Sequence, residues 1–246
     1  MPKTQVHKKN RQPRRFFLWE KKTRNSDTIE ISLRISIFSS TQKSDTPSCM
    51  SYLKEFRAAA SRTRKLGLDD IAMHETPMAL DPSLLNALEA TGHIPFAQRA
   101  KNAFNVNFGM FHMVAKKFHI PGAIMTLGNV KVHGEKRFQA TSTSFKEIIR
   151  EQSGEENMGH YHLWTTLPGG YILDHAILPG LQADGIITVD DMLPAERYLY
   201  DHADELPHGL TYHPMIVGLE FFVASGTIDR EALEYLMGEQ FPKQYQ

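Results

Sequence analysis

The sequence predicts an α+β domain in which N-terminal helices precede a mainly antiparallel sheet. Close to Pro121 the spacing of apolar residues changes from about 3.6 to about 2, which indicates a change from helices to strands. Short glycine-containing turns separate the later segments, and such turns join antiparallel neighbours. With 246 residues, of which 41% are hydrophobic, the chain has enough apolar side chains for a sizeable core.

Residues 1–49 differ from the rest of the chain in charge. Residues 50–246 hold 17 of the 28 basic residues and 24 of the 28 acidic ones, a net charge of −7. We expect residues 1–49 to be a basic leader that is disordered or not part of the native protein, and residues 50–246 to form a single α+β domain. A mildly acidic domain does not attract phosphates in general, so we expect no nucleic-acid partner for residues 50–246.

The cysteine content and the hydropathy bear on location. The single cysteine, Cys49, cannot form an intramolecular disulfide, which fits a reducing compartment and predicts a cytoplasmic protein. No apolar run approaches the roughly 20 residues that cross a bilayer, so we expect no membrane partner.

Helical spacing dominates the first half of the domain. The helix predicted over residues 51–65 has Leu53, Phe56 and Ala60 on one face. The helix predicted over residues 108–118 has a longer apolar stripe, and we expect its N-terminus to point at the hairpin of the second half. Two further helices are predicted, from Asp81-Pro82 to Gly92 and over residues 95–105.

The second half alternates strands with short helices. In chain order we predict strands over 123–133 and 137–142, a helix over 145–152, a β-hairpin over 159–177, a helix over 190–200, a strand over 210–224 and a final helix that Thr227 can cap.

The predicted hairpin holds the residues that could carry chemistry. Pro168-Gly169-Gly170 supplies its turn, and the period of two places His160 and His162 on one side of the first arm. Asp174 lies on the returning arm, within side-chain reach of the first, so we expect it to hydrogen-bond to His162. A histidine oriented by a carboxylate is the base half of a catalytic triad.

This hairpin resembles that of the transglutaminase-like cysteine enzymes, which have the papain-like superfold. The resemblance rests on His162-Leu163-Trp164, the glycine turn and Tyr171-Ile172-Leu173-Asp174, and more loosely on the helix over 108–118 with the His119-Ile120-Pro121 that follows it. It covers about residues 100–178. It implies a transglutaminase-like, papain-like core in which His162 is the general base, Asp174 orients it and Trp164 forms a substrate-binding wall.

The resemblance also implies an activity: hydrolysis, deamidation or acyl transfer at an amide bond of a protein or peptide-like substrate, without a cofactor. The sequence departs from the family at the nucleophile, because residues 50–246 contain no cysteine. Asn105, Asn107 and Gly109 occupy the region where the family has one. Either Cys49 replaces it, or the domain is a pseudoenzyme that kept the scaffold for binding.

Two alternatives stay open from the residues alone. His160, His162 and Asp174 form a set of two imidazoles and a carboxylate that suits iron or zinc, with His133 and His175 as further ligand candidates. Such a set would make the protein a metal-dependent enzyme. The other alternative is a non-catalytic binding domain, in which these histidines are ordinary strand residues.

Overall fold

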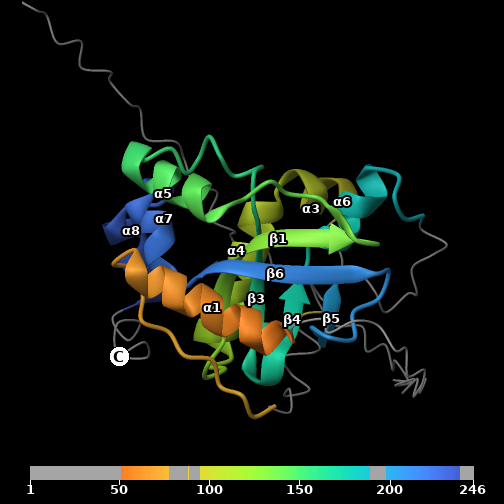
Figure 1. The fold of residues 1–246 in the computed structure, drawn as a ribbon, viewed down its shortest axis with the longest axis horizontal. Coiled ribbons are helices and arrows are strands. Elements are labelled where there is room, and N and C mark those ends of the chain that lie inside the picture. The colour runs from red at the N-terminus through yellow and green to blue at the C-terminus, as the bar shows by residue number, and fades with distance from the viewer. Residues whose placement is uncertain (1–50, 78–87, 89–94, 189–197, 239–246) are drawn as a thin grey trace, which may run out of the picture. The chain divides into compact units, whose positions relative to one another are not determined.

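The computed structural model describes residues 51–77, 88, 95–188 and 198–238, all within one compact unit that spans residues 47–246 (Figure 1). The predicted leader and Cys49 lie outside the described residues. Of the helix expected from Asp81 to Gly92 only Leu88 is described, and it is helical. None of the helices in the described part of the chain has both the length and the hydropathy that a membrane span requires.

The domain is α+β, with helices before strands as the sequence predicts. Its elements, in chain order, are α1 (Tyr52–Lys65), α3 (Phe96–Lys101), α4 (Ala103–His112), the π-helix η1 (Met113–Lys117), β1 (Ile124–Val132), β2 (Glu135–Lys136), α5 (Ser142–Glu151), β3 (His162–Leu167), the 3-10 turn η2 (Pro168–Gly170), β4 (Tyr171–Asp174), α6 (Ile177–Ala183), β5 (Leu199–His202), β6 (Leu210–Val217), α7 (Glu220–Ala224) and α8 (Arg230–Met237).

The strands form one antiparallel sheet in the order β2-β1-β3-β4-β5, and β6 pairs with β1 (Figure 1). The predicted hairpin is present as β3 and β4. Its turn depends on Gly169 and Gly170, whose φ angles of 79° and 85° lie in the left-handed region that glycine adopts without strain. Strand β3 lies between β1 and β4, and all of its residues are buried.

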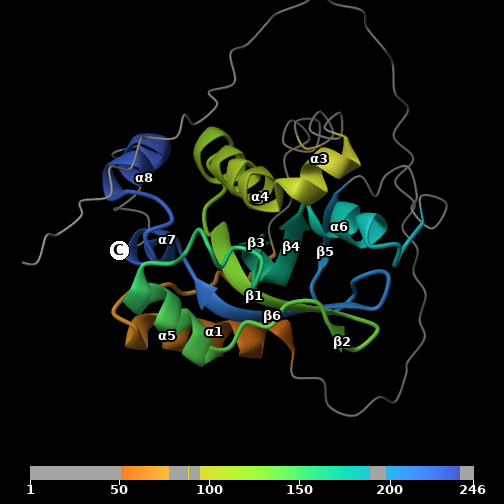
Figure 2. The same cartoon turned by 90° about the horizontal axis from the view of Figure 1, so that it is seen from above.

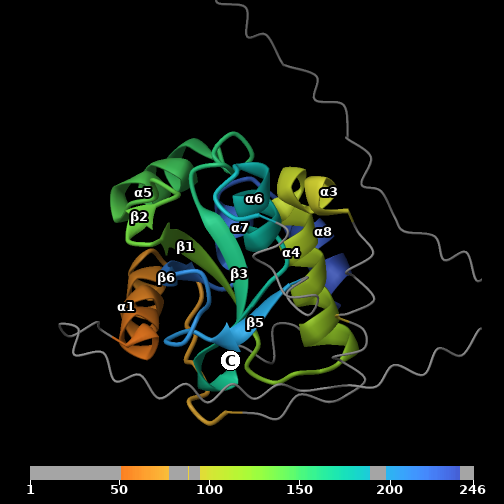
Figure 3. The ribbon, with the colours of Figure 1, turned by 90° about the vertical axis from the view of Figure 1, so that its right-hand side faces the viewer.

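Two hydrophobic cores lie on opposite faces of this sheet. Helix α1 covers one face, where Tyr52 and Phe56 share a core with Trp164, and α4 covers the other, where Phe111 shares a core with Leu163. Figures 2 and 3 show the sheet between these two helices. Successive residues of β3 contribute to different cores because strand side chains alternate between faces.

The helix predicted over residues 108–118 begins earlier and changes form near its end. α4 is regular from Ala103 to His112, and a π-helix follows, in which the N–H of Phe118 bonds to the carbonyl of Met113. The wider turn shifts the positions of the side chains that follow it. Phe108 and Phe111, which precede the π-helix, are buried, whereas Phe118, which follows it, is only partly buried.

Two predicted strands are wrong over part of their length. The strand predicted over 137–142 does not form, because β2 ends at Lys136 and Phe138 turns toward the candidate site. The strand predicted over 210–224 ends at Val217, and residues 220–224 are helical. Gly218, with φ of 91°, ends the strand, and Asp69 accepts a hydrogen bond from the N–H of Glu220 at the start of α7 (3.0 Å).

The helix predicted over residues 190–200 is wrong at its described end. Residues 190–197 lie outside the described residues, but Leu199 and Tyr200 belong to β5, which pairs with β4. Tyr200 stands opposite Leu173 in that pairing. Pairing with an available sheet edge outweighs the local helical spacing on which the prediction relied.

Replacing Phe111 by alanine tests the packing of α4. The side chain is fully buried, so we expect the substitution to lower the free energy of unfolding by about 3–5 kcal/mol in urea denaturation. Phe118→Ala, at a partly buried position beyond the π-helix, is the matched control and should cost less. Equal losses at the two positions would contradict this arrangement of the helix.

Candidate functional site

The predicted hydrogen bond between His162 and Asp174 is confirmed. His162 Nε2 lies 2.5 Å from Asp174 Oδ2, and both side chains are buried. His162 begins β3 and Asp174 ends β4. In the β3–β4 pairing Thr165 stands opposite Leu173. One residue further along, Trp164 therefore stands opposite Asp174, and His162 is the diagonal neighbour of Asp174 on the same face.

Hydrogen-bond donors from several elements surround the Asp174 carboxylate. Besides His162, the donors are the Tyr212 hydroxyl (2.7 Å, to Oδ2) and, to Oδ1, Asn107 Nδ2 (2.9 Å) and the backbone N–H groups of Ala176 (2.8 Å) and Ile177 (3.1 Å). Burial by itself would raise the pKa of this carboxyl group. The charge and hydrogen bond of His162, with the hydrogen bonds from Ala176 and Tyr212, outweigh burial and lower the pKa to about 2.

Asn107 joins α4 to the hairpin. Its side-chain amide donates to the carbonyl of Leu163 (2.7 Å) as well as to Asp174, and its Oδ1 accepts from the N–H of His175 (2.8 Å). One buried amide thus bonds to β3, to β4 and to the segment after β4. In the sequence, Asn107 stands out only as a residue in the region where the transglutaminase-like enzymes have a cysteine. The sign that could have revealed it is its position one helical turn before Met110 and Phe111, which puts an amide on the apolar face of the helix.

Two aromatic rings hold the His162 imidazole in place. Phe138 stacks on one side at 5.1 Å between centroids, and Trp164 lies nearly parallel at 6.2 Å. Trp164, which we expected to be a substrate-binding wall, is fully buried and does not line the cavity at the site. Its Nε1 donates to the Tyr52 hydroxyl (2.9 Å), so it supports His162 from the side of α1.

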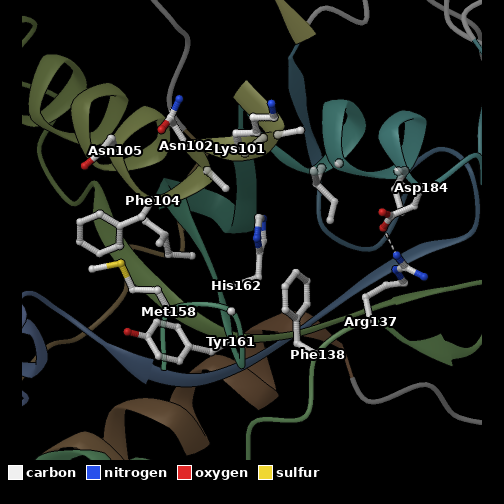
Figure 4. Close-up of a pocket in the computed structure, with 18 residues that line it drawn as sticks. Lys101, Asn102, Phe104, Asn105, Arg137, Phe138, Met158, Tyr161, His162 and Asp184 are labelled. Atoms are coloured by element: carbon white, nitrogen blue, oxygen red, sulfur yellow. Dashed lines mark hydrogen bonds and ion pairs between the residues drawn. The ribbon is translucent and has the colours of Figure 1, made fainter. Parts of the chain in front are cut away.

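A cavity of about 410 Å³ opens beside His162 (Figure 4). Its walls come from the junction of α3 and α4, from Arg137 and Phe138, from the start of β3 and from α6. Figure 4 shows the His162 ring directed at the α3–α4 junction. Nε2 of His162 is hydrogen-bonded to Asp174, and no described residue bonds to Nδ1. Nδ1 is therefore the ring nitrogen that is available to a ligand in the cavity.

The N-terminus of α4 forms part of the cavity wall through residues 103–105. The side chain of Asn102 does not cap the helix, because its Nδ2 donates to the carbonyl of Gln98 (3.0 Å). The first N–H groups of a helix have no partner within the helix and carry its partial positive charge. The start of α4, which no side chain caps, therefore borders the cavity that contains the imidazole.

The alternative metal set is not assembled. His160 is exposed in the turn before β3, so the expectation that it shares a strand face with His162 is wrong. His175 is fully buried against Tyr198, at 4.9 Å between stacked rings, and burial lowers its pKa to about 3. Across residues 51–77, 88, 95–188 and 198–238, no three His, Cys, Asp or Glu side chains are grouped as a metal site requires.

The cavity wall offers no conventional nucleophile. None of the described residues that line it is a cysteine, serine or threonine. Ala103, Phe104 and Asn105 occupy the start of α4 at this wall. The described part of the chain thus brings together a buried imidazole, the carboxylate bonded to it and a space for a ligand, with no thiol or hydroxyl of cysteine, serine or threonine in the described wall.

Comparison with known proteins finds no relative. A scan against models of protein families, a search of curated proteins and a search of solved structures each return no match for this chain. The functional interpretation therefore depends on the geometry of the site.

The ionisation of Asp174 makes stability depend on pH. Because its pKa falls from 3.8 to about 2 on folding, the stabilisation is complete above about pH 4 and is lost as the pH falls through about 2. The effect is on the order of 2 kcal/mol. Urea denaturation across this range should show the difference between the wild type and Asp174→Asn shrinking toward low pH. A difference that stays constant would contradict an ionised carboxylate.

Removing the Asn107 amide should destabilise the domain without creating a cavity. Asn107→Leu removes the acceptor of the His175 N–H and one of the three donors to Asp174 Oδ1, and we expect a loss of about 3 kcal/mol in the free energy of unfolding. Asn105→Leu, at an exposed position of the same helix, should be nearly neutral. Similar costs at both positions would show that Asn107 has no such role.

Proposed function

We propose that the protein is an acyl hydrolase acting on amide bonds, with His162 as the general base, Asp174 as its orienting partner and water as the nucleophile. One observation carries the proposal. The buried carboxylate engages Nε2 of His162, which leaves Nδ1 as the proton acceptor at a cavity large enough for a small acyl substrate. A neutral ring that donates from Nε2 has its lone pair on Nδ1.

The reaction would proceed in two proton transfers. His162 Nδ1 takes a proton from a water molecule while the water oxygen bonds to the carbonyl carbon of the substrate. The tetrahedral intermediate then collapses, the C–N bond breaks, and the leaving nitrogen takes the proton from His162. Asp174 stabilises the imidazolium that exists between these steps, and Phe138 and Trp164 keep the ring from turning away.

The end of α4 suits the negative charge that develops on the carbonyl oxygen. The start of α4 has no side-chain cap and borders the same cavity as the base, so its N–H groups are the candidates for holding an oxyanion that forms there. Preorganised donors of this kind lower the barrier because they do not need to reorient during the reaction.

A transglutaminase-like, papain-like core is consistent with this arrangement. The histidine and the aspartate lie on neighbouring strands, and the N-terminus of an upstream helix faces the histidine, as the resemblance implies. The chain departs from that family at the helix start, which carries no thiol. Under our proposal water replaces the thiol, so hydrolysis or deamidation is favoured over acyl transfer through a covalent intermediate.

A binding domain that has lost catalysis is the second candidate, and the lack of a thiol at the helix start favours it. The cavity and the oriented imidazole would then serve to hold an acyl or peptide-like ligand. Turnover separates the two proposals, since both expect ligand binding and only the first expects cleavage.

Replacing His162 tests the catalytic proposal. With a panel of acyl p-nitroanilides, we expect His162→Gln to lower kcat by at least about 100-fold, the contribution typical of a general base. His160→Gln changes an exposed histidine two residues away and should leave turnover unchanged. Activity that survives in His162→Gln would refute the role of His162, and activity lost on chelation alone would favour the metal-dependent alternative.

A further inference from the structure

The polar side chains at the cavity are unequally distributed around His162. Figure 4 shows Phe104, Met158 and Tyr161 on one side of the imidazole, and Arg137 with Asp184 on the other. Lys101 lies above the ring in the same view. The wall therefore combines one apolar side with one side that carries the Arg137–Asp184 pair, and Lys101 lies between the two sides.

Arg137 is held close to the base by its neighbour in sequence. Phe138 stacks on His162, so the backbone of Arg137 is one peptide bond away from a residue that contacts the base. Arg137 itself is about a third exposed and lines the cavity. Its guanidinium can present parallel N–H donors to a carboxylate, a geometry that lysine lacks.

The present partner of Arg137 is one that a ligand could replace. Asp184 forms an ion pair with Arg137, but the Asp184 side chain is 54% exposed and follows the end of α6. Exposed pairs of this kind contribute little to stability, so exchanging one carboxylate for another costs little. Lys101 is exposed, and no ion pair involves it within the described part of the chain. Lys101 lines the same cavity, so its positive charge adds to that of Arg137 there.

We propose that the substrate of this site carries a carboxylate, recognised by Arg137 with help from Lys101, a short distance from the amide carbonyl that His162 attacks. This inference rests on the proposed function, because it places the reacting carbonyl at His162. It narrows the substrate class from amides in general to amides of acidic acyl groups, such as the monoamide of a short dicarboxylic acid. The apolar end by Phe104 and Met158 then receives the other substituent of the amide.

Two substrates of equal length test the charge preference. Glutaric acid mono-p-nitroanilide and pentanoic acid p-nitroanilide differ mainly in a terminal carboxylate that replaces a methyl group. We expect kcat/KM to favour the charged compound by about tenfold, the size of one charge-assisted hydrogen bond in a partly exposed site. In Arg137→Gln the preference should disappear through a higher KM for the charged compound.

Two further variants serve as comparisons. Asp184→Asn removes the competing carboxylate and should increase the preference for the charged compound. Arg150→Gln removes an exposed arginine that pairs with Glu151 on α5 and does not line the cavity, so it should change neither rate. Thermal unfolding of each variant checks that the fold is intact. Equal kcat/KM for the two substrates, or a preference that Arg137→Gln leaves intact, overturns the inference.

A binding measurement separates this inference from the proposed function. Glutaramate and pentanamide are the matching unactivated amides, and their affinity for the full chain can be measured by ligand-observed NMR. If neither anilide is cleaved, the catalytic proposal fails, and tighter binding of glutaramate that is lost in Arg137→Gln still supports the carboxylate site. If His162→Gln abolishes cleavage while the two amides bind equally, the catalytic proposal stands and the carboxylate site is wrong.

Discussion

The hydrogen bonds to the Asp174 carboxylate are the constraint on which the site depends. A charge buried in a protein is costly unless it is paired and hydrogen-bonded. Here His162 from β3, Tyr212 from β6, Asn107 from α4 and the backbone at the start of α6 all donate to it. Each of these elements must therefore keep its position relative to the end of β4. The same bonds that make the charge tolerable also determine the orientation of the imidazole.

Helix α1 supports the His162–Asp174 pair indirectly, through Trp164, although it contributes no residue to the cavity. The Tyr52 hydroxyl bonds to Trp164 Nε1 (2.9 Å) and to Thr166 Oγ1 (2.6 Å), which in turn bonds to Thr126 Oγ1 (2.8 Å). This chain of buried polar groups links the helix to β3 and to β1. Trp164 is thereby held beside His162, so the packing of one face of the sheet limits the freedom of the imidazole ring.

The two sides of His162 have separate tasks in the proposed chemistry. Nε2 bonds to Asp174 in the interior, and Nδ1 is left for a cavity that the start of α4 borders and that Lys101 and Arg137 line. A site of this kind favours negative charge, both the charge that forms on a carbonyl oxygen and a charge that the substrate already carries. The absence of a thiol at the cavity wall does not alter these features, because none of them depends on a covalent intermediate.

The sequence by itself determined the α+β class, the hairpin and the His162–Asp174 pair. These follow from short-range rules: the change in apolar period, a glycine turn that returns one strand onto the next, and the reach of side chains across such a turn. Only the tertiary structure decided that Asn107 and Tyr212, which lie 67 and 38 residues from Asp174, complete its hydrogen bonds. It also decided that Trp164 is buried and that His160 lies outside the site. The same holds for the strand β5 and for the position of Arg137 at the cavity. These features arise where distant segments meet. The pattern of neighbouring residues does not show which distant segment will make the contact.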